Sequence, residues 1–136
     1  MHRIFIPTLM LAWPATAPAA GLSGNWITQD RSAIVAIAPC GTKLCGAIAR
    51  ILVDKPGVPS TDVRNPDPAL RSKPLVGLRI LSGFTGKDDR WDEGRIYDPQ
   101  SGKSYRSKLR LNKDGSLNVS GCIAFLCKTQ SWTRGR

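Results

Sequence analysis

The sequence contains a single histidine, His2, and it lies near the N-terminus. Without a histidine in its folded part, a chain builds no Ser-His-Asp triad or Cys-His dyad, and no histidine-containing zinc site. Acidic residues gather at Asp88, Asp89, Asp92 and Glu93, but their basic neighbours indicate a solvated charged turn rather than the facing carboxylates of a glycosidase. The sequence therefore predicts a protein that is not an enzyme and that holds no metal or cofactor.

Apolar runs long enough to span a membrane are also lacking. The apolar stretch 4–13 follows a basic residue and is shorter than a transmembrane helix, and Ala17 and Ala19 stand in the A-x-A relation that signal peptidase accepts. This layout predicts a signal peptide over residues 1–20, cleaved near Ala19 or Ala20. The protein is then expected to be periplasmic or secreted, with no transmembrane span after cleavage.

Acidic residues are half as numerous as basic ones, ten against twenty. One basic residue, Arg3, falls in the predicted signal peptide, so nineteen minus ten leaves a net charge of +9 on residues 21–136. Such a charge suits nucleic acid, anionic lipid or a polyanionic wall component, or it simply keeps a protein soluble. Because the charges are spread along the chain and export separates the protein from DNA, we expect no nucleic acid. The candidate partners are an envelope protein or an anionic surface.

Residues 95–119 carry the clearest strand pattern. From Tyr105 to Leu111, apolar or small residues alternate with polar and charged ones, as in a strand with one wet face. Asn112-Lys113-Asp114-Gly115 then suits a hairpin turn, because Asp-Gly accepts positive backbone dihedrals. This meander needs a second layer, or closure into a barrel, to cover its apolar side.

Further strands are expected at 24–28, 33–38, 46–53 and 78–84, and in the final segment through Arg134. About eight short strands predict one all-β domain over residues 21–136. We favour a single antiparallel up-and-down barrel, and an open sandwich of similar strand count is the alternative. Segment 54–74 holds five prolines and is expected to be a long surface loop, pinned by pairing among its charged side chains. Asp67 is expected to cap one helical turn in it.

Four cysteines form two C-x4-C units, Cys40 with Cys45 and Cys122 with Cys127. Structural zinc prefers the tighter C-x2-C spacing, and export to an oxidising compartment favours disulfides. The chain-entropy model gives roughly 2 kcal/mol for a short closed loop and about 4 to 5 kcal/mol for a long crossed one. Crossed pairing would stabilise more, but residues at a hairpin base are already close, so we expect the two local disulfides.

The last hairpin has an apolar tip, Ile123-Ala124-Phe125-Leu126, although hairpin loops are usually polar. If they are exposed, Ile123, Phe125 and Leu126 form a contact surface for a partner, a membrane or a second copy of the chain. If the tip folds inward, it plugs an open barrel end instead. Both alternatives remain open from the sequence.

Gly24-Asn25-Trp26 opens the first expected strand, and Arg134 lies in the last. This arrangement resembles that of lipocalin-like barrels. The resemblance implies that the arginine lies across the tryptophan and closes the barrel floor, a cation–π contact of about 1 to 2 kcal/mol. The pair would be structural.

A series of short motifs runs through the chain in order. It comprises Gly24-Asn25-Trp26, Pro39-Cys40-Gly41, Leu44-Cys45-Gly46, Asn65-Pro66-Asp67, Leu70-Arg71, Lys73-Pro74-Leu75, Gly77-Leu78, Trp91 with Gly94, Ile96-Tyr97-Asp98-Pro99, Gly102-Lys103 with Tyr105, and Gln130 with Trp132-Thr133-Arg134. Together these motifs resemble the DUF2147 family of small secreted bacterial proteins. The resemblance implies a periplasmic or secreted lipocalin-like barrel and transfers no activity, substrate or catalytic residue.

A lipocalin-like barrel holds an apolar or amphipathic ligand inside, with a few polar groups at its mouth. We expect such a pocket with loop 54–74 as its lid, although the aromatic residues alternatively only fill a small barrel. The candidate ligand-binding residues are Arg71, Arg79, Trp91, Arg95, Tyr97 and Tyr105. The leading hypothesis is a secreted binding protein for a small apolar or amphipathic anion. The alternative is a cell-envelope interaction module that uses its basic surface and the 123–126 tip.

Overall fold

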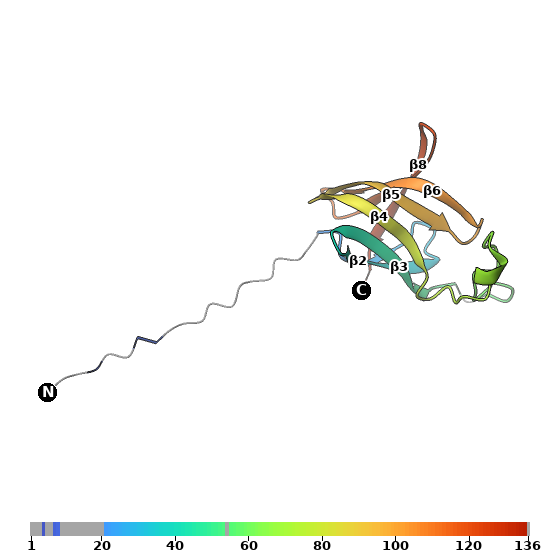
Figure 1. Ribbon diagram of the computed structural model, residues 1–136, viewed down its shortest axis with the longest axis horizontal. Coiled ribbons are helices and arrows are strands. Elements are labelled where there is room, and N and C mark those ends of the chain that lie inside the picture. Colours follow the sequence, from blue (N-terminus) through green and yellow to red (C-terminus); the bar gives the residue numbers. More distant parts are fainter. Residues whose placement is uncertain (1–3, 5–6, 9–20, 54, 136) are drawn as a thin grey trace.

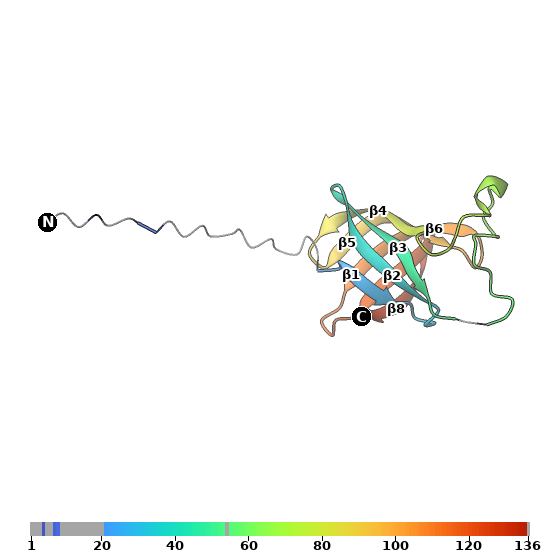
Figure 2. The ribbon, with the colours of Figure 1, turned by 90° about the horizontal axis from the view of Figure 1, so that it is seen from below.

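The computed structural model describes residues 4, 7–8, 21–53 and 55–135. The predicted cleavage site and most of the predicted signal peptide lie outside the described residues. Eight antiparallel strands form a closed up-and-down barrel in which β1 pairs with β8 (Figures 1 and 2). The strands are β1 (Gly24–Ile27), β2 (Ala33–Cys40), β3 (Lys43–Ile51), β4 (Arg79–Lys87), β5 (Arg90–Asp98), β6 (Lys103–Leu111), β7 (Leu117–Ile123) and β8 (Leu126–Arg134). The predicted barrel is confirmed, and the sandwich alternative is not what forms.

Several boundaries differ from the sequence-based expectation. β2 continues through Pro39, which is tolerated because it lies one residue from the end of the strand. β4 continues through the expected polar turn to Lys87 and pairs there with the start of β5, which leaves only Asp88 and Asp89 as the turn. Charged side chains do not prevent pairing here, since they point to solvent while the backbone continues the ladder.

The one helical element among the described residues is the 3-10 turn η1 (Pro68–Leu70) in the long loop. Asp67 caps it as predicted, because its carboxylate accepts a hydrogen bond of 3.0 Å from the Ala69 amide. Among all the residues that the structure describes, no helix has the length and apolar character to cross a membrane.

Strand direction gives the barrel two different ends. The β1–β2, β3–β4, β5–β6 and β7–β8 connections share one end, here called the mouth, and the other three connections lie at the floor. The long β3–β4 loop, green in Figure 2, extends beyond the mouth. The core fills the barrel toward the floor. Its fully buried large side chains are Trp26, Trp132, Phe84, Leu22, Leu44, Leu81, Leu109 and Leu117.

Close packing around Phe84 depends on a glycine. Gly94 lies on β5 beside β4, and a Cβ at this position would overlap the Phe84 ring. The ring therefore occupies the space that any other residue at position 94 would fill. The β5–β6 register shifts between Trp91 and Gly94, and Glu93 takes a positive φ of 61° within this bulge.

The floor is closed by Arg134. Its guanidinium carbon lies 4.0 Å from the centroid of the Trp26 ring, as the lipocalin resemblance implies. The same guanidinium donates hydrogen bonds of 2.9 and 2.8 Å to the carbonyls of Ser23 and Gly21, and the Trp26 indole donates to the Leu22 carbonyl at 2.8 Å. Arg134 thus holds the segment before β1 across the barrel end.

Both disulfides have the local pairing. Cys40–Cys45 clamps the β2–β3 hairpin at the floor, and Cys122–Cys127 clamps the β7–β8 hairpin at the mouth. In the second pair the two cysteines are direct cross-strand partners in the register. Proximity within each hairpin decides the pairing, although a crossed arrangement would close longer loops.

Candidate functional site at the barrel mouth

A cavity of about 620 Å³ opens at the mouth, and we call it the mouth cavity. It is lined by Ile96, Asp98, Tyr105, Val119, Gly121, Ile123, Leu126, Cys127, Lys128 and Gln130. Apart from Cys127, these residues alternate along β5 to β8 in the same phase as the core residues Leu117 and Trp132. They therefore belong to the inner face of the barrel, above the packed core.

Small side chains keep this space open. Gly121 has no side chain, and a Cβ there would meet Ile96 and Tyr105 at 3.7 Å, an ordinary contact distance. Ser107 lies opposite Gly121 on β6, and its hydroxyl is buried without a hydrogen-bond partner among the described residues. A buried hydroxyl is normally satisfied, so Ser107 is an exception at the level of Gly121.

Two carboxylates stand at the rim. Asp98 accepts hydrogen bonds of 2.9 Å from the Gln100 amide and the Ser101 hydroxyl, so it also shapes the β5–β6 turn. Burial alone would raise the pKa of Asp30, but hydrogen bonds from Ser32, Thr28 and Gln100 outweigh it and lower the pKa. Asp30 therefore stays ionised at neutral pH.

Two further cavities lie at the mouth, the first beside the mouth cavity and the second beside the first. The first, of about 170 Å³, shares Ile96, Asp98 and Gln130 with the mouth cavity and reaches down to Trp132. The other, of about 500 Å³, lies between the barrel and the long loop, with Val58 among its lining residues. The mouth is thus a set of adjoining spaces that the long loop partly covers.

The long loop is anchored by a buried carboxylate. Asp62 is 1% exposed, and its carboxylate accepts hydrogen bonds of 2.7 Å from the Tyr97 hydroxyl and 2.8 Å from the side-chain amide of Asn65. Burial, this hydrogen bond to Asp62 and the charges of Asp62 and Asp98 together raise the pKa of Tyr97 to about 12. The Arg64 carbonyl also lies against Gly102, where a Cβ would overlap it. The loop is thereby fastened to the β5–β6 hairpin.

The expected charge pairing within the loop is not what holds it. Arg71 donates a hydrogen bond from Nε to the backbone carbonyl of Asn65 at 2.7 Å. The one ion pair in the described part of the chain joins Arg110 to Asp92, which lie in the barrel and not in the loop. The prediction was wrong because hydrogen bonds to backbone and to Tyr97 satisfy the loop's polar groups instead.

The six candidate ligand-binding residues separate into groups. Tyr105 lines the mouth cavity and Tyr97 lines the smaller space beside it. Trp91 is buried in the core. The three arginines do not line the three mouth spaces: Arg71 is in the loop, Arg79 is exposed on β4, and Arg95 lines a groove on the outer face. The arginines therefore do not form an anion site at the mouth.

The β7–β8 tip does not plug the barrel. Phe125 is 91% exposed, Leu126 72% and Ile123 67%, and Figure 1 shows the hairpin, red, standing out from the body of the barrel. Of the two alternatives, the structure has the exposed tip.

Some residues of this region carry no local signal in the sequence. Asp62 looks like any other charged loop residue, and only its tertiary environment distinguishes it. A signal did exist on β8, where Leu126, Lys128 and Gln130 precede Trp132 at every second position. Polar residues at inward positions above a buried tryptophan indicate where the interior meets water.

Comparisons with known proteins agree with this architecture. A bacterial family described as "Uncharacterized protein conserved in bacteria (DUF2147)" matches residues 24–134. Among solved structures, protein HP1028 from Helicobacter pylori, described as belonging to the lipocalin family, superposes with a TM-score of 0.73. The two chains are 24% identical, over 85% of this chain and 83% of the other, so the likeness shows the fold. None of the curated proteins matches the sequence.

Proposed function

Since the chain belongs to the DUF2147 family and has a lipocalin-like barrel, we propose that it is a carrier that binds a small apolar or amphipathic ligand in its mouth cavity. The observation that carries this proposal is the space of about 620 Å³ above a packed core. Small-molecule pockets typically measure roughly 300 to 1,000 Å³, so the cavity has the size of one small ligand.

The lining defines the kind of ligand. Ile96, Val119, Ile123 and Leu126 offer an apolar wall, Asp98 lies at the mouth end of β5, and Lys128 and Gln130 lie between Leu126 and the buried Trp132 on β8. A short acyl chain or a flat ring suits this wall, and a polar head group suits the rim. Because the core is filled below this level, a long chain would have to extend outward.

The charge at the rim revises the expected ligand. Asp98 and Lys128 both line the mouth cavity, and Asp30 lines the smaller space next to it. Since the predicted arginines lie elsewhere, the rim carries no excess of positive charge. We therefore propose a neutral or zwitterionic head group rather than an anion.

Location and enzyme class follow the same proposal. Two disulfides fit an oxidising compartment, and together with the predicted signal peptide they support a periplasmic or secreted carrier. The only histidine of the chain is His2, which supports binding rather than acid–base catalysis.

The test fills the cavity. Gly121→Leu adds a side chain that points between Ile96 and Tyr105, and its backbone does not need a positive φ. We expect the variant to fold and to lose binding of N-phenyl-1-naphthylamine, a neutral apolar fluorescent probe. Decanol, decanoate and decylamine, used as competitors, would then rank the head groups.

The matched control is Ser104→Leu, which adds the same side chain one residue before Tyr105 on the outer face of β6. This control should bind the probe as the unmodified protein does. Equal probe binding by Gly121→Leu and the unmodified protein would show that the probe binds elsewhere and would overturn the proposal.

A further inference from the structure

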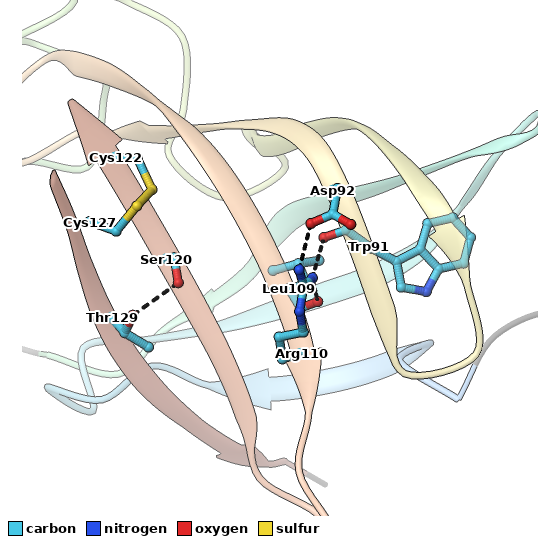
Figure 3. A network of polar contacts seen from close by, with 8 residues as sticks. All are labelled: Trp91, Asp92, Leu109, Arg110, Ser120, Cys122, Cys127 and Thr129. Atoms are coloured by element: carbon cyan, nitrogen blue, oxygen red, sulfur yellow. Dashed lines mark hydrogen bonds and ion pairs between the residues drawn. A yellow bond between two sulfur atoms is a disulfide. The ribbon is translucent and has the colours of Figure 1, made fainter. Parts of the chain in front are cut away.

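The β7–β8 tip combines exposure with rigidity. Phe125 stands at its end, and the cross-strand disulfide Cys122–Cys127 fixes its base (Figure 3). Behind the disulfide, the Ser120 and Thr129 hydroxyls bond across the same two strands at 2.9 Å. A large apolar side chain such as Phe125, exposed at a rigid and projecting point, is typical of an interaction site.

Positive charge surrounds this tip. The mouth-side parts of β6, β7 and β8, residues 103–108 and 120–130, hold four basic residues and no acidic one; the basic residues are Lys103, Arg106, Lys108 and Lys128. The guanidinium of Arg106 bonds the Ala124 carbonyl in the tip itself.

An outer groove of about 690 Å³ beside the tip is lined in part by Phe125, Arg95, Arg106 and Lys108. Asp92 and Glu93 also line it, but Asp92 is paired with Arg110 at 2.6 Å (Figure 3). The groove therefore keeps an excess of positive charge next to the apolar tip.

The charge selects among the possible occupants. A second copy of this chain would bring the same basic groups into contact and repel. An anionic bilayer instead offers acyl chains for the apolar tip and phosphates for its basic flanks, which is how interfacial elements bind membranes.

We infer that the β7–β8 tip docks the protein onto an anionic lipid bilayer. Phe125 enters the interface with Ile123 and Leu126, while Arg106, Lys108 and Lys128 bind lipid phosphates. Ile123 and Leu126 also line the mouth cavity, so docking brings the mouth to the bilayer surface. This inference does not depend on ligand binding.

The experiment is co-sedimentation of the protein, with both disulfides formed, with vesicles of phosphatidylethanolamine and phosphatidylglycerol. We expect binding that weakens as salt rises and that is lost on neutral phosphatidylcholine vesicles. Phe125→Asp should weaken binding about tenfold or more, since it places a charge where an aromatic ring would enter the bilayer interface. Lys128→Gln should weaken binding about fivefold.

Two controls match these changes. Thr42→Asp places the same carboxylate on an exposed residue of the β2–β3 turn at the floor, and Lys113→Gln removes one charge at the floor. Both should bind vesicles as the unmodified protein does. Circular dichroism would verify that Phe125→Asp, changed at a 91% exposed side chain, remains folded.

A second readout is spectroscopic. In Phe125→Trp the new indole is exposed, whereas Trp26, Trp91 and Trp132 are buried. Anionic vesicles should shift its emission to the blue, and brominated acyl chains should quench it. Unchanged vesicle binding by Phe125→Asp would overturn the inference, as would a lack of any binding by the unmodified protein. Self-association lost in Phe125→Asp, without vesicle binding, would assign the tip to a second copy.

Discussion

Removing the Tyr97 hydroxyl should release the long loop from the barrel mouth. In Tyr97→Phe, Asp62 loses a hydrogen bond of 2.7 Å and keeps the 2.8 Å bond from Asn65. Hydrogen bonds to charged groups contribute about 1.5 to 3 kcal/mol. Losing this one destabilises the closed loop, because the Asp62 carboxylate is 1% exposed and water does not replace the hydroxyl. The loop needs only local opening to return Asp62 to water, so we expect that opening to become about ten to a hundred times more frequent.

Amide hydrogen exchange measures this opening. The reporters are the amides of Asp62 and Leu75, which donate to the carbonyls of Lys73 and Ser60 at 2.9 and 3.0 Å. Tyr105→Phe is the matched control, because no described residue bonds the Tyr105 hydroxyl. Equal exchange in Tyr97→Phe and in the unmodified protein would refute the anchoring role of this hydrogen bond.

The same contact predicts the response to alkaline pH. Tyr97 has a pKa of about 12 when folded, above the ordinary value near 10, so folding favours its protonated form. Its contribution to stability is complete below about pH 10 and is lost as pH rises through about 12. Tyrosinate absorbance should therefore show a titration well above pH 10. In Tyr97→Phe that late titration should be missing.

Two predictions concern the packed end of the barrel. Arg134→Lys removes the planar guanidinium from Trp26 and should lower the free energy of unfolding by about 1 to 2 kcal/mol. Tryptophan fluorescence should then show a lower denaturant midpoint, and an unchanged midpoint would contradict the closing role of Arg134. Gly94→Ala places a Cβ on the Phe84 ring and should lower the same free energy by about 1 to 3 kcal/mol. Phe84→Leu introduced together with Gly94→Ala should recover part of that loss. If the free-energy changes of the two single substitutions simply add in the double variant, this packing argument is contradicted.

The sequence determined the architecture because barrel strands are local objects. Alternation along residues 103–111 and the turn at 112–116 specify a hairpin without reference to the rest of the chain, and repeated hairpins close into a barrel. The disulfide pairing was accessible for the same reason, since each pair closes one hairpin. The Trp26–Arg134 contact joins the two ends of the chain and came from resemblance to known barrels.

The tertiary structure decided what the mouth contains. Whether an arginine such as Arg95 faces a cavity or the outer surface depends on strand phase around the closed barrel, and the bulge before Gly94 alters that phase. Asp62 became an anchor only when the loop placed it beside Tyr97, a neighbour 35 positions away in the chain. The tip at Phe125 is apolar in the sequence in either case. Its exposure follows from the hairpin standing clear of the barrel, a global geometry that no local pattern encodes.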